Sequence, residues 1–149
     1  MVKVKEFRID VFNAGVMVFI GNPEDMVSYI KIKKKNKNLA EAIEKHDFTN
    51  ADGTQWGCVG GNQVVWLEKL SIRSLARLAY HIATATHEAF HATADLMNTK
   101  GVEYGSDEND SNEAFAYTIG WIMQNIIEPK GYTIYKQPKK KKNVKNSNS

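Results

Sequence analysis

The sequence predicts an α+β domain in which a small mixed or antiparallel sheet packs on one long amphipathic helix. Three observations support this prediction: strand-like apolar segments near the N-terminus, a helical apolar period over residues 71 to about 98, and a second helical segment from about 112 to 128. The chain has 149 residues, which is enough for one domain with a sizeable core.

The predicted sheet begins with two N-terminal strands. Residues 2–12 alternate between apolar and polar side chains as a half-exposed strand does, and residues 16–21 form a more apolar run after a turn at 13–15. Residues 54–70 are typical of a hairpin, with glycines in its turn at 60–62.

Two short helices are predicted between these strands. Pro23 suits the first turn of a helix, and the acids Glu24 and Asp25 are favoured near a helix N-terminus. Residues 39–46 predict a second short helix.

The long helix is predicted to begin after an N-cap at Ser71 and to stop at Gly101. At 100° per residue, its apolar side chains form one stripe centred on Leu75. The members of this stripe are Leu75, Leu78, Ala79, Ile82, Thr86, Ala89, Phe90, Leu96 and Met97. The last helix ends before Pro129, and residues 131–135 predict a short closing strand.

Charge divides the chain into a body and a tail. Six lysines and no acids lie in residues 136–149, so subtracting them from the net charge of +3 leaves −3 for residues 1–135. We therefore expect a single domain over 1–135 and a basic, disordered tail over 136–149 that solubilises the protein or binds nucleic acid or another acidic surface. One cysteine excludes an internal disulfide, and no apolar run is long enough to cross a bilayer, so we expect a cytoplasmic protein without a membrane partner.

The long helix contains the motif His87-Glu88-Ala89-Phe90-His91. Residues four apart lie one turn apart on the same helix face, so two imidazoles at this spacing can bind one zinc ion. On the predicted stripe both histidines fall at the edge of the buried face, and Glu88 lies about 100° from His87, where a base for a metal-bound water belongs. His81 falls on the opposite side and is not a predicted ligand. The alternative is a helix without metal in which these residues share a register by chance.

Catalytic zinc usually has three protein ligands, so a third ligand is needed. Glu113 is the favoured candidate because the small residues Ala116 and Gly120 beside it would allow a close approach to the histidine helix. A capping box with Asp110 explains Glu113 equally well. Asp95, four residues after His91, either orients that histidine or is a solvated acid. The other acids between the two helices are Glu103, Asp107, Glu108 and Asp110.

The segment "HEAFH", followed 22 residues after its last histidine by the glutamate of "NEAFAY", resembles the gluzincin metallopeptidases. Over residues 64–127 the chain is also similar to small phage-encoded zincin-like proteins and, more distantly, to repressor-cleaving metalloproteases. The resemblance implies a minimal zincin-like domain with a crossing C-terminal helix and one Zn²⁺ ion. It implies that His87, His91 and Glu113 bind this ion and that Glu88 is the general base.

The resemblance further implies a zinc-dependent hydrolase, a metallopeptidase that acts on a peptide or protein substrate in the cytoplasm of a bacterial host. In zincins an edge strand upstream of the zinc helix pairs with substrate, and residues 63–70 resemble that strand; the alternative is an ordinary strand of the sheet. The chain departs from the larger enzymes in its small size and in having no marked residue to stabilise the oxyanion. Tyr117 is a candidate for that role, as are Tyr104 and Tyr132. The alternative is a zincin-like metal-binding protein without peptidase activity that binds a host or regulatory partner.

Overall fold

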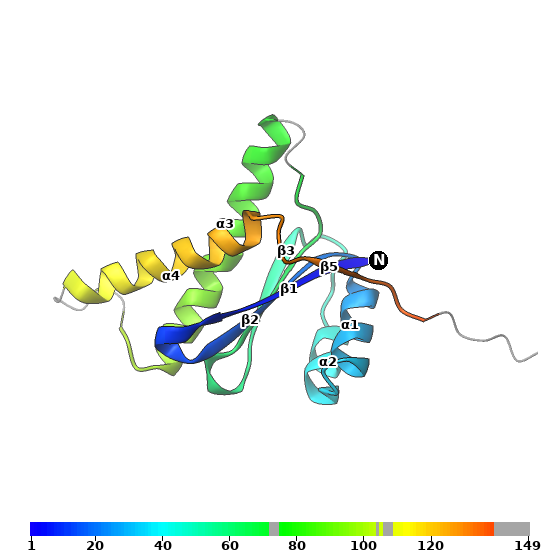
Figure 1. Ribbon diagram of the computed structural model, residues 1–149, viewed down its shortest axis with the longest axis horizontal. Helices are drawn as coiled ribbons and strands as arrows, with labels where there is room; N and C mark the ends of the chain where they lie inside the picture. The colour runs from blue at the N-terminus through cyan, green and yellow to red at the C-terminus, as the bar shows by residue number, and fades with distance from the viewer. Residues whose placement is uncertain (72–74, 104, 106–108, 139–149) are drawn as a thin grey trace, which may run out of the picture.

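A computed structural model describes residues 1–71, 75–103, 105 and 109–138. Within these residues the fold is α+β, as predicted, and consists of a mixed five-stranded sheet with helices on both faces (Figure 1). The strands are β1 (Val2–Ile9), β2 (Ala14–Gly21), β3 (Gly53–Gly57), β4 (Gln63–Leu67) and β5 (Thr133–Tyr135). Their order across the sheet is β3-β4-β2-β1-β5.

Two hairpins build most of this sheet. β1 and β2 pair antiparallel through a short 3-10 turn, Asp10–Phe12, and Asn13 adopts a left-handed conformation at its end. β3 and β4 form the predicted hairpin over a second 3-10 turn, Val59–Gly61. The hairpins join where β4 pairs with β2 in parallel, so β4 lies inside the sheet.

The two faces of the sheet carry separate cores because alternate side chains of a strand point to opposite faces. The helices α1 (Pro23–Ile32) and α2 (Lys37–Glu44) pack on one face, against Phe19 and Trp66. The helices α3 (Leu75–Thr99) and α4 (Asn109–Ile127) pack on the other. The predicted start of α1 is confirmed, because the Asn22 side chain accepts hydrogen bonds from the backbone N–H groups of Glu24 and Asp25.

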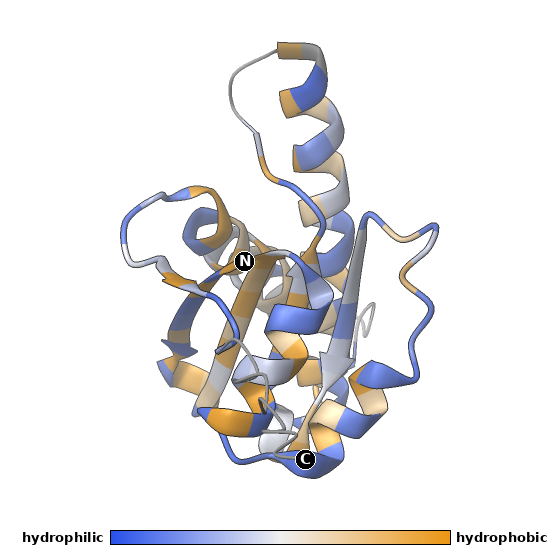
Figure 2. Ribbon diagram, turned by 90° about the vertical axis from the view of Figure 1, so that its right-hand side faces the viewer, coloured by the Kyte–Doolittle hydropathy of each residue, from blue (hydrophilic) through white to orange (hydrophobic). Residues whose placement is uncertain are grey.

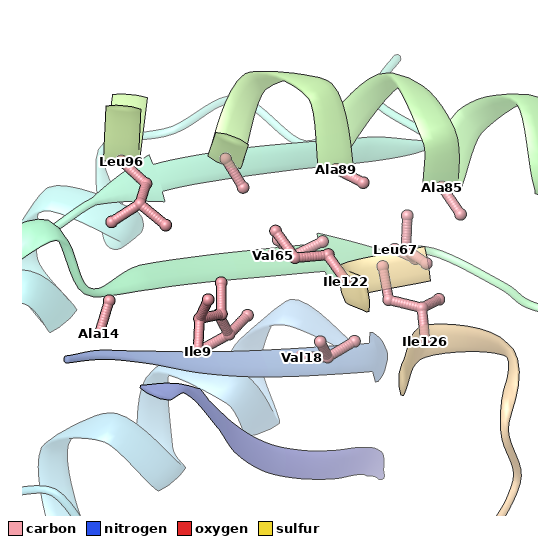
Figure 3. Packing of buried hydrophobic residues seen from close by; sticks show 12 residues of the cluster. Ile9, Ala14, Val18, Val65, Leu67, Ala85, Ala89, Leu96, Ile122 and Ile126 are labelled. Carbon is pink, nitrogen blue, oxygen red and sulfur yellow. The ribbon is translucent and has the colours of Figure 1, made fainter. Parts of the chain in front are cut away.

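The buried face of α3 differs from the predicted stripe. Ala85, Ala89 and Leu96 contact the sheet beside Val65, as Figure 3 shows. Leu75, the centre of the predicted stripe, is exposed, and so is Phe90. The N-terminal end of α3 extends beyond the sheet in both ribbon views, so apolar residues there have nothing to pack against (Figures 1 and 2). Small alanines mark the real contact face instead.

The edge strand β3 lies directly on α3 at two glycines. A Cβ atom at Gly57 would stand 2.1 Å from Asp95 Oδ2, and one at Gly53 would stand 2.9 Å from Glu88 Cγ. Both distances are far below van der Waals contact. Because these two residues have no Cβ atom, the strand can lie directly on the helix.

The first and last described segments meet at Asp25. This buried carboxylate accepts hydrogen bonds from the Met1 amine and from the backbone N–H of Gln137, 2.8 Å away. The chain is thus held to α1 as far as Gln137, whereas residues 139–149 of the predicted tail lie outside the described residues. Among the described helices, none is both long and apolar enough to cross a membrane.

The glycine contact predicts a specific loss of stability. Gly57→Ala should lower the free energy of unfolding by about 1–3 kcal/mol, because the new methyl group displaces Asp95 or the strand. Gly120→Ala is the matched control, since a Cβ at that helical position meets no atom within 4 Å; it should raise stability by about 0.5–1 kcal/mol. Urea denaturation of dilute protein measures both, and equal effects would contradict the close packing of β3 on α3.

Candidate metal-binding site on α3

The side chains of His87 and His91 meet on the outside of α3. Their Nε2 atoms lie 2.9 Å apart, so one ring donates a hydrogen bond to the other, and the ring centroids are 4.5 Å apart. Two nitrogen ligands on a tetrahedral zinc ion with bonds of about 2.0–2.1 Å are separated by about 3.3 Å. A small opening of the two rings therefore suits them to one ion.

The two histidines and Glu88 do not lie on the sides of the helix where the sequence predicted them. Both histidines are exposed instead of bordering the buried face, whereas Glu88 is only 6% exposed. The shift follows from the true contact face of α3, which is centred on its alanines and brings Glu88 under β3 beside Gly53. The structure thus places a buried carboxylate next to an exposed pair of metal-ligating side chains.

No hydrogen bond of the Glu88 carboxylate is seen among the described residues, and its oxygens are not fully enclosed, because they are not among the buried atoms that lack a partner. Burial raises the pKa of its carboxyl above the usual value of 4.5. The imidazoles of His87 and His91 oppose this increase, and that of His46 does so more weakly, without cancelling it. A carboxylate with a raised pKa accepts a proton more readily near neutral pH, which is the property a general base needs.

The structure does not bring Glu113 to the histidine pair. Glu113 lies on the exposed outer face of α4, together with Ala116 and Gly120, so the close approach predicted through these small residues does not occur. Among the described residues, no group of three His, Cys, Asp or Glu side chains is placed to hold a metal ion. Two of the predicted ligands are therefore together, and Glu113 remains a prediction.

The residues predicted to support the metal site have other contacts or are exposed. Asp95 accepts a hydrogen bond from Gln63 Nε2 at 2.8 Å and so connects α3 to β4. Tyr117 is 76% exposed on α4. Tyr132 donates to the carbonyl of Ile126, 3.0 Å away, and burial raises the pKa of its hydroxyl.

Other residues weighed from the sequence are also accounted for. His81, which was not a predicted ligand, accepts a hydrogen bond at Nδ1 from the backbone N–H of Ser71. Tyr104, Asp107 and Glu108 lie outside the described residues, as does the side chain of Asp110.

The strand beside the site is β3 and not the predicted segment at residues 63–70. All five residues of β4 are buried, and β4 is paired on both sides by β2 and β3. That prediction was wrong because the parallel pairing with β2 puts β4 inside the sheet. The free edge belongs to β3, which contacts Glu88 through Gly53.

Sequence reasoning missed His46, which follows α2. Its ring packs edge-on against Phe48 and Trp56, with centroids 4.8 and 5.5 Å away, and its buried Nε2 atom finds no hydrogen-bond partner within the described part of the chain. It lies close enough to Glu88 to affect the pKa of that carboxyl. No motif marks His46, and its position depends on contacts between segments distant in the sequence.

Comparisons with protein families, with curated proteins and with solved structures found no match. The chemistry of the residues on α3 is therefore the basis for any functional conclusion.

Burial of Glu88 predicts a stabilising substitution. In metal-free protein at neutral pH, Glu88→Gln should raise the free energy of unfolding by about 1 kcal/mol, because a largely covered carboxylate, whose charge the fold disfavours, is replaced by a neutral amide. The folded-state pKa is raised, so the ionised form destabilises the fold at high pH. The gain should therefore shrink as the pH falls through the folded-state pKa and disappear below about 4.5.

Urea denaturation at several pH values measures this effect. Glu113→Gln is the control, and should change stability by less than about 0.5 kcal/mol because Glu113 is exposed. A loss of stability in Glu88→Gln at neutral pH would show that Glu88 is satisfied in the fold.

Proposed function

We propose that the protein is a zinc-dependent hydrolase, a metallopeptidase built on a minimal zincin-like domain. The observation that carries this proposal is the position of Glu88, whose side chain is largely covered by the fold one residue from His87 in the pair of exposed imidazoles. Burial raises the pKa of this carboxyl, and a carboxyl group with a raised pKa beside two imidazoles is a candidate proton acceptor.

Two of the three proposed ligands suit a zinc ion. His87 and His91 supply two imidazole nitrogens from one rigid helix at a separation close to that of zinc ligands. Zinc bound there would polarise a substrate carbonyl and lower the pKa of a bound water. Glu88 would accept a proton at its carboxylate and pass it to the leaving group, and the covering strand β3 keeps bulk water from one side of this carboxylate.

The free edge of β3 supports a peptide substrate. An extended peptide can add to an open strand by backbone hydrogen bonds, and this strand contacts the proposed base directly. Glu113 remains the proposed third ligand, in which case the first turns of α4 take up a different position relative to α3 when zinc binds. The alternative function is metal-dependent binding of a partner without turnover, which the exposure of both histidines favours.

Metal analysis tests the first step of the proposal. Purified protein dialysed against zinc should retain about one ion per chain, and His87→Ala or His91→Ala should lower the affinity at least tenfold. His81→Ala is the matched control and should bind zinc like the wild type, because its ring contacts the backbone of Ser71. Glu113→Ala tests the third ligand: unchanged affinity would exclude it. Failure of the wild type to bind zinc would end both metal-dependent proposals.

Hydrolysis of a peptide library by the zinc-loaded protein tests the second step. Glu88→Gln should keep the zinc and lower kcat by about 10²-fold or more, since the proton acceptor is lost. Turnover that survives this substitution would refute the role of Glu88. Stoichiometric zinc with no turnover by the wild type would instead support the partner-binding alternative.

A further inference from the structure

The turn between α1 and α2 is strongly basic. Lysine occupies five of the seven positions from 31 to 37, and no acid lies between positions 26 and 40. The side chains of these lysines are exposed. Residues 1–135 as a whole have a net charge of −3, so the turn is a local exception to the charge of the domain. An exposed cluster of like charges is typical of a surface that binds a partner of opposite charge.

Most of this charge is not neutralised within the fold. Two of the five lysines form ion pairs, with Glu6 and Glu44. The other three, Lys33, Lys35 and Lys37, have no acidic partner among the described residues. Lys35 also adopts a left-handed backbone conformation, with a φ of 53°, which favours glycine or asparagine over lysine. Three like charges within five residues repel one another, and a bound anion would remove this repulsion.

A hollow in the protein surface opens beside this turn. Its volume is about 480 Å³, and Lys34, Asn36 and Leu39 line it from the turn. From the sheet it is lined by Arg8 of β1 and Met17 of β2. Met17 and Leu39 are partly buried apolar residues, so part of the wall is apolar. The hollow therefore combines apolar surface with a cation on each side.

The positive charge of the hollow is not cancelled by its acids. Glu6 is the only acid that lines it, and Glu6 is paired with Lys34. Arg8 donates a hydrogen bond to Asn13 and lies 3.8 Å from Asp10. The side chains of Arg8 and Asp10 are 61% and 92% exposed, and an ion pair as exposed as this one is weak. A guanidinium has five N–H groups, so Arg8 keeps donors for an anion.

We propose that the basic turn and the hollow beside it bind single-stranded nucleic acid. The phosphates of a strand repeat their negative charge at regular intervals, so they can contact Lys33, Lys35 and Lys37 while Arg8 meets the strand from the other side. Each nucleotide also carries a base beside its phosphate, and the base can enter the hollow against its apolar wall. A flat membrane surface has no such group to place there.

The binding should depend little on base sequence. The side-chain amides of Asn62 and Gln63, which also line the hollow, are hydrogen-bonded within the chain, to Gly15 and Val59 and to Gly61 and Asp95. Contacts to phosphates alone carry no sequence information. The surface contains neither of the exposed histidines of α3, so this proposal does not depend on the proposed hydrolase activity.

Fluorescence anisotropy of a labelled oligo-dT of about 20 nucleotides tests the proposal in the full chain at about 50 mM salt. The wild type should bind. The triple variant Lys33→Gln/Lys35→Gln/Lys37→Gln should raise the dissociation constant at least tenfold. It should also lower the slope of log affinity against log salt by about 2, since each phosphate contact on a single strand contributes about 0.7.

The matched control removes the same charge elsewhere. Lys3→Gln/Lys45→Gln/Lys130→Gln replaces three exposed lysines that have no ion pair among the described residues, and it should change the dissociation constant by less than about threefold. The basic tail needs its own variant, with the lysines at 139–142 replaced by glutamine. In that background the turn variant should still weaken binding at least tenfold. A wild type that does not bind, equal losses in turn variant and control, or a loss confined to the tail variant would overturn the proposal.

Two further measurements test the hollow. Arg8→Gln should weaken binding about threefold or more, whereas Arg77→Gln, which replaces an exposed arginine of α3, should not. Cys58 is the only cysteine of the chain and lines the hollow, so saturating oligo-dT should slow its alkylation by N-ethylmaleimide at least threefold. An unchanged alkylation rate together with equal binding by the two arginine variants would show that the strand does not enter the hollow.

Discussion

The close contact of β3 with α3 determines the rest of the site. Two glycines in a five-residue strand and a row of alanines on the helix allow the edge of the sheet to approach the helix backbone. At the Gly57 end of this contact, Asp95 accepts a hydrogen bond from Gln63 of the neighbouring strand β4. At the Gly53 end, the same close approach covers Glu88. A residue with a Cβ atom at either glycine would have to displace side chains of the helix, Asp95 at Gly57 or Glu88 at Gly53, or the strand itself.

In the proposed hydrolase, this arrangement would separate two chemical requirements on a single helix. Metal ligands need access to the ion and its substrate, and the two histidines are exposed. A base needs a pKa closer to neutral, and burial of Glu88 raises its pKa. Neighbouring residues on a helix point about 100° apart, so one can lie under the strand while the next faces solvent. The edge of β3 is the boundary between these two environments.

Local sequence patterns predicted the helices and strands well, but they predicted poorly which of these elements lie side by side. The α+β class, the start of α1 and the β3–β4 hairpin follow from turn residues, caps and apolar periods, which act over a few positions. The interior position of β4 does not, because its parallel pairing with β2 joins segments more than forty residues apart. The buried face of α3 was misplaced for a similar reason. Its large apolar residues dominate the helical period, but Leu75 at its N-terminal end is exposed, and the sheet contacts Ala85, Ala89 and Leu96 instead.

The position of Glu113 follows from how α4 is anchored. Ile122 and Ile126 pack in the core beside Ala85 and Ala89, and the ammonium group of Lys5 donates to the Glu128 carbonyl, 3.1 Å away, just beyond the helix. A cation there also interacts favourably with the helix dipole. Both contacts lie in the last turns of the helix. Glu113 is 15 residues before Glu128, which is about 22 Å along the axis. These contacts fix the end of α4 that meets the sheet, and the buried residues Phe115 and Thr118 hold the helix nearer to Glu113, whose own side chain is left on the exposed face.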